Sequence, residues 1–460
     1  MHLHILGICG TFMGGLALLA RELGHQVTGS DTGAYPPMSD MLSNAGIEAF
    51  EGYHPEHLVP ETDLVLVGNS LSRGNAAVEA MLERRLAYTS GPAWLAQTVL
   101  SQRKVLAVAG THGKTTTSAM LAHILGACGP APGFLIGGLP GTFKTSAQLG
   151  DSDLFVIEAD EYDTAFFDKR SKFIHYHPDI AVLTNLEFDH ADIFNSIEDI
   201  ERQFHHLIRT VPPDGRLIVN GDDKRLGHVL SMGYWTPVEF WNTQRPAVDD
   251  WQVANDNPDS SRFTVSRQGS NAGTVAWDLI GRHNLSNGVA AVAAAVATGT
   301  PVADACEALA SFKLPGRRLE LVSHRIDGTR LFDDFAHHPS AITATLKALR
   351  QQTSKGRLIA VIDPRSNTMK LGIHVTELSN AILDADITIV FKHNGLHWDP
   401  ATLAPPENST KLHVLESASE ILSELKAQVR PGDTVVLMSN GSFDGLRTGL
   451  SSWMDASGCD

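Results

Sequence analysis

One glycine-rich stretch holds the residues with the clearest chemical character: Gly110-Thr111-His112-Gly113-Lys114-Thr115-Thr116. It follows an apolar run at 105–109 and precedes a helical pattern at 117–125. Glycines let backbone N–H groups turn toward an anion, and the helix adds the positive end of its dipole. Lys114 can reach the β- and γ-phosphates of a nucleotide, and Thr115 can bind Mg²⁺. Two residues separate the glycines, where the common pattern has four, so the stretch predicts a shortened nucleoside-triphosphate loop.

A carboxylate, an amide and a histidine follow two further apolar runs. Glu158 comes directly after the first run and opens an acidic loop, and Asn185 and His190 follow the run at 180–183. Open α/β sheets place ligands at the carboxyl ends of their strands. We therefore expect Glu158 and His190 to hold Mg²⁺, and Asn185 to lie near a transferred phosphate. A solvated acidic loop and a structural histidine are the alternatives.

The first hundred residues begin with a strand, a glycine-containing turn and a helix. Gly7, Gly10 and Gly14 resemble the dinucleotide fingerprint, but Cys9 and Phe12 stand where it requires glycine. The N-terminus of the helix still predicts a pyrophosphate site, which would also suit a UDP-sugar. A packing turn and a nicotinamide site are the alternatives. The expected substrate residues follow three strands and are Gly10, Thr11, Phe12, Met13, Ser30, Asp31, Asn69 and Ser70.

Strands alternate with helices along the whole chain, which predicts an α/β protein with parallel sheets and right-handed connections. We expect three domains. They are a Rossmann-like N-terminal domain at 1–102, a central P-loop ATPase-type domain at 103–316 and a C-terminal Rossmann-like domain at 317–460. Short strand-like runs at 236–280 predict a small sheet insertion. Clefts between such domains are natural ligand sites.

Composition limits the classes of function. The chain has 460 residues, of which 43% are hydrophobic, so it can form large cores. Its net charge of -16 gives no electrostatic reason to bind nucleic acid or an anionic membrane. The cysteines are far apart and indicate neither a disulfide framework nor a zinc site. The alanine-rich run at 289–297 is too short to span a bilayer. We therefore expect a cytoplasmic protein without nucleic-acid or membrane partners.

Six motifs occur together in the order that is typical of one family. They lie at 110–116, 158–161, 184–190, 281–287, 316–320 and 333–339. Together they resemble the Mur ligases of peptidoglycan synthesis, and the resemblance covers essentially the whole chain. Three further stretches, at 7–15, 166–173 and 363–370, are similar to the members that attach a murein tripeptide to UDP-N-acetylmuramate.

The resemblance implies roles for residues of the central and C-terminal domains. Lys114 would bind the γ-phosphate of ATP and Thr115 the first Mg²⁺. Glu158 and His190 would hold the second Mg²⁺, and Asn185 would lie near an acyl phosphate. The implied ATP site also includes Gly110, Thr111, His112, Gly113, Thr116, His283 and Asn287, together with Arg318 at a phosphate and Asp334 at the ribose.

The peptide end of the site rests on fewer features. The planar fork of Arg365 fits a tripeptide carboxylate bidentately, with an ordinary surface arginine as the alternative. His338 is a candidate base for the amine, with a packing histidine at a helix start as the alternative. Some family members use a carboxylated lysine beside the second metal. No lysine occurs here between Lys172 and Lys224, so we do not expect that group.

The resemblance implies an ATP-dependent ligase with ATP and Mg²⁺ as cofactors. It would join UDP-N-acetylmuramate to the tripeptide L-Ala-γ-D-Glu-meso-diaminopimelate through an acyl phosphate, in peptidoglycan recycling. The C-terminal domain would close over ATP and exclude water. Three alternatives stay open: a UDP-N-acetylmuramate–L-alanine ligase, a nicotinamide oxidoreductase and a non-catalytic nucleotide switch.

Overall fold

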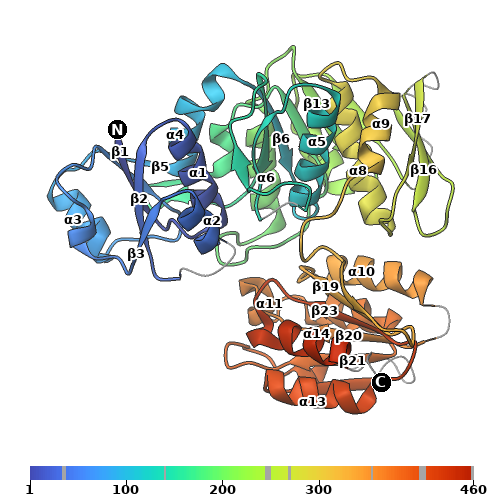
Figure 1. Ribbon diagram of the computed structural model, residues 1–460. Helices are drawn as coiled ribbons and strands as arrows, with labels where there is room; N and C mark the ends of the chain where they lie inside the picture. Colours follow the sequence, from blue (N-terminus) through green and yellow to red (C-terminus); the bar gives the residue numbers. More distant parts are fainter. Residues whose placement is uncertain are drawn as a thin grey trace.

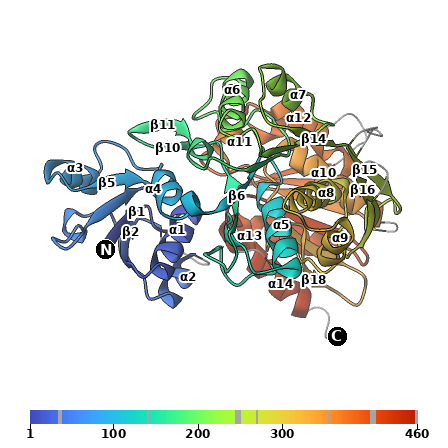
Figure 2. The same ribbon diagram turned by 90° about the horizontal axis from the view of Figure 1, so that it is seen from above.

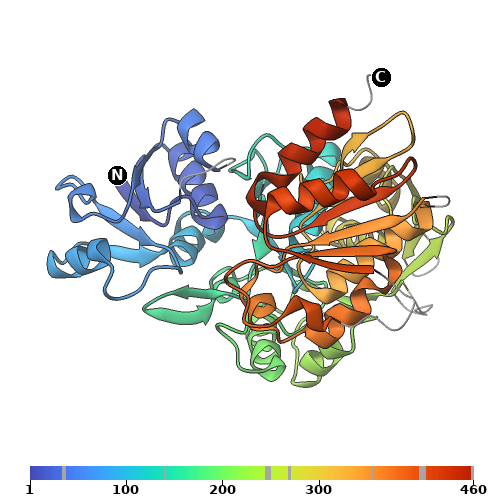
Figure 3. The same cartoon turned by 90° about the horizontal axis from the view of Figure 1, so that it is seen from below.

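The structure, a computed structural model, describes residues 1–33, 38–138, 141–243, 250–267, 271–353, 356–403 and 411–456. Within these ranges the strands form three large sheets, each in its own lobe (Figure 1). The N-terminal lobe runs from His2 to Gln102, the central lobe from Lys104 to Ala310 and the C-terminal lobe from Glu320 to Ala456. Views from above and below show the N-terminal lobe to one side of the other two (Figure 2, Figure 3).

The N-terminal lobe has the Rossmann-like strand order. Its strands are β1 (His2–Leu6), β2 (Gln26–Asp31), β3 (Glu48–Glu51), β4 (Leu64–Val67) and β5 (Tyr88–Ser90), and its helices are α1 (Thr11–Glu22), α2 (Met38–Asn44), α3 (Ala76–Glu83) and α4 (Gly91–Thr98). The strands are parallel in the order β3-β2-β1-β4-β5. This is the order of a doubly wound Rossmann sheet, and its switch point lies between β1 and β4. The α/β prediction is confirmed here.

The central lobe is built on the longest sheet of the described chain. Its strands are β6 (Lys104–Ala109), β7 (Gly133–Leu135), β8 (Ala147–Gln148), β9 (Leu154–Ala159), β12 (Ile180–Leu183), β13 (Arg216–Asn220), β14 (Val238–Trp241), β15 (Trp251–Asn255), β16 (Arg262–Arg267) and β17 (Asn271–Ala276). They pair in the order β17-β16-β15-β14-β13-β12-β6-β9-β7-β8. A separate antiparallel hairpin consists of β10 (Asp163–Ala165) and β11 (Asp168–Ser171).

Helices cover both faces of the central sheet, because alternate residues of each strand point to opposite sides. The helices are α5 (Lys114–Cys128), α6 (Ile197–Ile208), α7 (Lys224–Ser231), α8 (Arg282–Val296) and α9 (Val302–Ala310). Val108 and Val182 pack on the side of α5, α8 and α9. Ala109 and Leu183 pack on the side of α6 and α7. These four strand residues are therefore buried beneath helices on the two opposite faces of the central sheet.

The predicted small sheet insertion at 236–280 takes a different form. Strands β14 to β17 continue the central sheet, with β15, β16 and β17 pairing antiparallel at its end. Residues 244–249 and 268–270 of this range lie outside the described residues.

The C-terminal lobe is a second doubly covered sheet. Its strands are β18 (Glu320–His324), β19 (Arg330–Asp334), β20 (Leu358–Ile362), β21 (Ile387–Phe391), β22 (Lys411–Leu415) and β23 (Thr434–Met438), in the order β18-β19-β23-β20-β21-β22. The helices are α10 (Pro339–Gln352), α11 (Asn367–Leu371), α12 (Val375–Ala381), α13 (Ala418–Gln428) and α14 (Leu446–Ala456). Only β18 runs antiparallel among these described strands. Helices α10 and α12 pack on one face, and α13 and α14 on the other.

The N-terminal and central lobes share a core. Leu16 of α1 belongs to the same buried apolar cluster as Leu135 of β7 and Phe155 of β9. This shared burial fixes the carboxyl end of β1 relative to the central sheet. No helix in the described ranges is long and apolar enough to cross a membrane.

Acid should destabilise the N-terminal lobe through His4. Its imidazole is fully buried between Thr28 and Ser30, which lie 2.9 and 3.0 Å from its ring nitrogens. Burial lowers the pKa of His4 to about 4, with the nearby His57 and His2 charges acting in the same direction. The folded state thus favours neutral His4, whereas the unfolded chain takes up its proton near pH 6.5. The stability is complete above about pH 6.5 and is lost as the pH falls toward 4.

For this one histidine we expect a loss of about 2 kcal/mol in the free energy of unfolding between roughly pH 7 and pH 5. Chemical denaturation of the full chain at a series of pH values measures it. Replacement His4→Gln removes the titrating group, so its pH slope should be shallower than that of the unmodified protein by this amount. Parallel slopes for the two proteins would contradict the prediction.

Candidate active site

The glycine loop connects β6 to α5 and needs glycine at two positions. Gly110 has φ 151° and Gly113 has φ 82°, a backbone region that favours glycine. A Cβ atom on Gly110 would lie 1.9 Å from the Thr184 hydroxyl oxygen. A Cβ atom on Gly113 would lie 2.5 Å from Oδ1 of Asn287. Helix α5 begins at Lys114, so its N-terminal N–H groups face the loop as a phosphate site requires.

Asn185, at the end of the neighbouring strand β12, holds this loop. Its Oδ1 accepts a hydrogen bond from the backbone N–H of His112 at 2.8 Å, and its Nδ2 donates to the carbonyl oxygen of His112 at 2.9 Å. The backbone N–H of Thr111 donates to the Asn185 carbonyl at 3.0 Å. The structure therefore places Asn185 at the loop, with its amide bonded to the loop backbone.

The Lys114 ammonium is surrounded by acceptors. Nζ donates to the Gly110 carbonyl at 2.7 Å and to Oε2 of Glu161 at 2.9 Å, and Oδ1 of Asp160 lies 3.8 Å away. Burial alone would lower the pKa of Lys114, but the carboxylates of Glu161, Asp160 and Glu158 raise it above its usual value. Lys114 therefore stays positively charged at the point where the loop and α5 meet.

Two carboxylates and an imidazole form a compact group beside Lys114. Donor atoms of Asp160, Glu161 and His190 lie within 4.8 Å of one another, and Nε2 of His190 is 3.2 Å from Oε1 of Glu161. His190 has φ 57°, a conformation that is uncommon for residues other than glycine and often marks a functional position. Oxygen ligands with one imidazole suit a divalent cation such as Mg²⁺ or Mn²⁺.

Glu158, the other predicted ligand of this metal, lies on the Thr115 side. Its carboxylate accepts hydrogen bonds from the Thr115 hydroxyl at 3.0 Å and from the Gly137 N–H at 2.7 Å. Burial raises the pKa of Glu158, while Lys114 acts in the opposite direction. The structure thus groups His190 with Asp160 and Glu161, and pairs Glu158 with Thr115, which is the residue expected at the first metal.

Most of the predicted ATP residues line one cavity of about 520 Å³ between the central and C-terminal lobes. Arg318 reaches across from the C-terminal side, and its Nη2 lies 3.3 Å from the Thr115 hydroxyl oxygen. Its guanidinium stacks on the ring of Phe335, 4.6 Å from the centroid. The predicted residues in the lining are Thr111, His112, Gly113, Lys114, Thr115, Thr116, Glu158, Asn185, His190, His283, Asn287, Arg318 and Asp334.

Two of these residues are held in defined states by burial. Burial lowers the pKa of His283 to about 4, so its imidazole is neutral near pH 7. Burial raises the pKa of Asp334, although the hydroxyl of Thr345 donates to its carboxylate at 2.8 Å. The N–H of Ala336 donates to the same carboxylate at 3.0 Å. The two hydrogen bonds hold the Asp334 carboxylate in the cavity wall.

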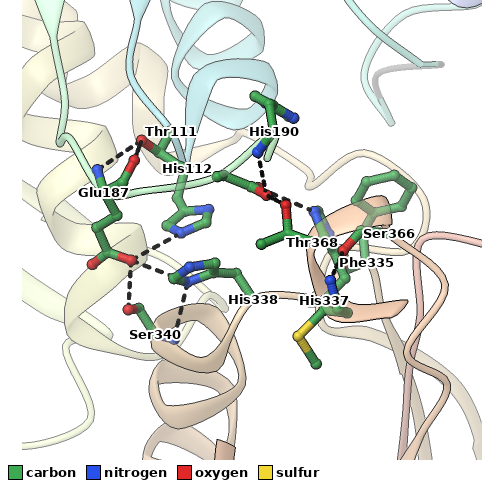
Figure 4. A network of polar contacts seen from close by, with 12 residues as sticks. Thr111, His112, Glu187, His190, Phe335, His337, His338, Ser340, Ser366 and Thr368 are labelled. Atoms are coloured by element: carbon green, nitrogen blue, oxygen red, sulfur yellow. Dashed lines mark hydrogen bonds and ion pairs between the residues drawn. The ribbon is translucent and has the colours of Figure 1, made fainter. Parts of the chain in front are cut away.

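Glu187 joins the glycine loop to the start of α10 (Figure 4). Its Oε2 lies 3.3 Å from Nε2 of His112 and 3.1 Å from Nδ1 of His338, and the Ser340 hydroxyl donates to it at 2.6 Å. Burial alone would raise the pKa of Glu187, but hydrogen bonds from His112 and His338 lower it below its usual range. The backbone N–H of Ser340 lies 3.4 Å from the same Nδ1 of His338, which places the imidazole at the start of α10. These contacts favour the alternative in which His338 is a packing histidine.

Further contacts between the two lobes come from the same loop after β12 (Figure 4). The Thr368 hydroxyl donates to Oδ1 of Asp189 at 2.7 Å. The Ala191 N–H donates to the Thr368 hydroxyl oxygen at 3.3 Å, and the His374 ring lies 3.0 Å from the Phe188 carbonyl oxygen. One loop therefore positions the glycine loop, the His190 group and the C-terminal lobe together.

The expected UDP-sugar residues lie at the carboxyl ends of adjacent strands around the β1–β4 switch point. Gly10, Thr11, Phe12 and Met13 form the turn and first turn of α1 after β1, and Asn69 and Ser70 follow β4. Asp31 ends β2 and accepts from the Cys9 N–H at 2.8 Å. Ser30 is fully buried between His4 and His57, each at 3.0 Å, so its side chain faces protein.

Arg365 lies away from the cavity lining and is already paired. Its Nε donates to Oδ2 of Asp363 at 2.7 Å, and its Nη2 donates to Oδ1 of Asp444 at 2.6 Å. A peptide carboxylate at this guanidinium would compete with both acids.

Sequence reasoning assigned no role to Glu161 or Glu187. Glu161 stood in the acidic run that follows β9, and only the path of the chain shows that it meets Lys114 and His190. Glu187 stood in the stretch between Asn185 and His190, and its partners lie 75 to 153 residues away. In both cases the sequence indicated an acidic residue just beyond the end of a strand. It did not indicate the direction in which the carboxylate points.

Comparison with known proteins covers all three lobes. Residues 2–103 match the model described as Mur ligase family, catalytic domain; residues 108–295 match the Mur ligase middle domain; and residues 317–441 match the Mur ligase, glutamate ligase domain. The chain is 49% identical, over 98% of its length and 97% of the relative's, to UDP-N-acetylmuramate–L-alanyl-γ-D-glutamyl-meso-2,6-diaminoheptandioate ligase of Escherichia coli (strain K12).

The relative of the same description from Haemophilus influenzae is 46% identical over 97% of each chain. The crystal structure of a murein peptide ligase from Psychrobacter arcticus superposes with a TM-score of 0.76 at 45% identity, covering 99% of this chain and 98% of the other. The chain therefore belongs to the Mur ligase family of ATP-dependent, amide-bond-forming enzymes.

Proposed function

We propose that this ligase joins UDP-N-acetylmuramate to the tripeptide L-alanyl-γ-D-glutamyl-meso-2,6-diaminoheptanedioate, in peptidoglycan recycling. The observation that carries the proposal is 49% identity, along nearly the whole of both chains, to a relative described by this reaction. Membership of the Mur ligase family leaves no role for the nicotinamide oxidoreductase or the non-catalytic switch. We place the reaction in the cytoplasm, where ATP and UDP-sugars are available.

The substrate carboxylate attacks the γ-phosphorus of ATP, which gives an acyl phosphate and ADP. The free amine of the tripeptide then attacks the acyl carbon, phosphate leaves with the electrons of the C–O bond, and the nitrogen loses a proton as the amide forms. Lys114 and Arg318 lie at the cavity wall where they would neutralise charge on the phosphate oxygens. The Glu187 and Thr368 contacts keep the two lobes together and would protect the acyl phosphate from water.

The residues present fit two Mg²⁺ ions. Thr115 would hold one, together with Glu158, which accepts a hydrogen bond from its hydroxyl, and the group of Asp160, Glu161 and His190 would hold the other. When bound, Mg²⁺ supplies positive charge at the transferred phosphate.

Phosphate release from ATP tests the proposed function. The assay contains Mg²⁺ and UDP-N-acetylmuramate with either the tripeptide or L-alanine, and mass spectrometry identifies the UDP product. We expect release and a UDP-tripeptide product with the tripeptide only. A product with L-alanine alone would assign the chain to the UDP-N-acetylmuramate–L-alanine ligases, and release that depends on neither acceptor would contradict the proposal.

A further inference from the structure

The hairpin of β10 and β11 extends from the central lobe and contacts the N-terminal lobe. Figure 2 and Figure 3 show the hairpin extending beside that lobe. The ring of Phe167, at its tip, meets the ring of Tyr88 with centroids 5.1 Å apart, and Phe166 packs against the apolar cluster around β4 and α3. The residues that follow this hairpin therefore have a fixed position relative to the proposed UDP-sugar site.

Lys172 comes directly after β11 and turns back toward the metal loop. Its side chain is only 8% exposed, and Nζ lies 3.4 Å from Oδ2 of Asp160. The same ammonium stands over two rings, 5.5 Å from the centroid of Phe12 and 5.4 Å from that of Tyr162. Tyr162 in turn packs on His190, with ring centroids 4.1 Å apart. One cation thus lies between the first turn of α1 and the proposed metal group.

This buried ammonium has more donors than the chain uses. A lysine ammonium carries three N–H donors. In the described part of the chain, Asp160 is the one hydrogen-bond acceptor of the Lys172 ammonium. The other oxygen of Asp160 lies 3.8 Å from Nζ of Lys114, so two ammonium groups share this carboxylate. Burying a cation is costly unless acceptors surround it, so the position suits a site that a further anion completes.

The proposed reaction requires an anion at this place. The pyrophosphate of UDP-N-acetylmuramate is expected at the first turn of α1, to which Phe12 belongs. The lactyl carboxylate at the other end of the same substrate must reach the γ-phosphate of ATP at Lys114. Lys172 lies between these points, because it contacts both Phe12 and the partner of Lys114. We infer that Lys172 binds the lactyl carboxylate of UDP-N-acetylmuramate and holds it beside the metal loop. The inference rests on the proposed function.

Direct binding of two nucleotides tests this role. UDP-N-acetylglucosamine has the same UDP-sugar frame as UDP-N-acetylmuramate but a hydroxyl in place of the lactyl ether, so it lacks the carboxylate. Calorimetry gives the dissociation constants of both for the full chain. Because a charge-assisted hydrogen bond would be lost, we expect Lys172→Gln to raise the dissociation constant of UDP-N-acetylmuramate about 10- to 100-fold. The dissociation constant of UDP-N-acetylglucosamine should change less than about twofold, since this nucleotide has no carboxylate to contact Lys172.

Two further variants complete the design. Lys172→Arg keeps a cation and should recover most of the discrimination between the two nucleotides. Lys169→Gln is the matched control, because Lys169 lies on β11 of the same hairpin and is 68% exposed in a surface pair with Asp163. Its dissociation constants should equal those of the unmodified protein. If Lys172→Gln weakens the binding of both nucleotides equally, Lys172 holds the two lobes together or contacts the pyrophosphate. If it weakens the binding of neither, Lys172 contacts neither nucleotide. Each of these results overturns the inference.

The phosphate-release assay separates this inference from the proposed function. If the unmodified protein binds UDP-N-acetylmuramate, and Lys172→Gln removes the discrimination, the inference stands even if the tripeptide is not the acceptor. If the unmodified protein does not bind UDP-N-acetylmuramate, both are overturned. If tripeptide-dependent release occurs but Lys172→Gln leaves the nucleotide preference unchanged, only the inference falls.

Discussion

Replacing Lys114 with methionine is expected to lower the rate of tripeptide-dependent phosphate release by about a thousandfold. Methionine keeps much of the side-chain length but removes the charge that faces Gly110, Glu161 and Asp160 at 2.7, 2.9 and 3.8 Å. Without that cation, the carboxylates of the site would repel the ATP phosphates, and Arg318 alone would face the charge on the phosphate oxygens. Both ATP affinity and the rate of phosphate transfer should fall.

The measurement compares kcat and KM for ATP in Lys114→Met and Lys104→Met. Lys104 starts strand β6, six residues before Gly110, and serves as a control for losing one lysine from the same structural unit. Calorimetric binding of UDP-N-acetylmuramate should be unchanged in both variants, which separates a loss of chemistry from a loss of fold. Retention of more than roughly a tenth of the activity in Lys114→Met would contradict the role given to this lysine.

The fold class can be predicted from short local patterns in the sequence. Apolar runs of four to six residues, each followed by a helical pattern, specify parallel strands with crossover helices. The two glycines of the loop follow equally directly, because Gly110 and Gly113 take backbone angles that other residues avoid. The ends of β6, β9 and β12 then meet, because neighbouring parallel strands end at one edge of the sheet.

The direction of each acid at that edge is a different matter. Strand β9 extends through Ala159, so Glu158 is still part of the strand and points toward Thr115. The chain turns only after it, which carries Glu161 to Lys114 and His190. A run of four residues with three acids does not reveal where the strand ends, and a difference of one residue would exchange the two sides.

Contacts between lobes were beyond sequence reasoning for another reason. Thr368 and Asp189 are separated by 179 positions, and neither has a neighbour in the sequence that indicates the other. Arg365 shows a similar difficulty within one lobe: its fork suited a substrate carboxylate, but Asp444, 79 positions away in the same C-terminal lobe, occupies part of it. Both pairs depend on how distant segments of the chain pack, which local patterns do not specify.

Replacing Glu161 with glutamine should raise the Mg²⁺ concentration needed for half-maximal activity by about 10- to 100-fold. The carboxylate is 1% exposed and contacts Lys114 at 2.9 Å and His190 at 3.2 Å. Burial alone would raise the pKa of Glu161, but Lys114 and His190 lower it below its usual range, so the group is charged at neutral pH. Glutamine keeps the shape of the side chain and removes that charge from the proposed metal group.

The Mg²⁺ dependence distinguishes a metal ligand from a mere counter-ion of Lys114. A ligand that has lost its charge binds Mg²⁺ more weakly, so excess Mg²⁺ should restore much of the rate in Glu161→Gln. A counter-ion role would instead change KM for ATP at every Mg²⁺ concentration and leave the half-saturation point where it was, which would contradict the prediction. Glu198→Gln is the control, because Glu198 lies in the first turn of α6, away from the group, and should leave both quantities unchanged.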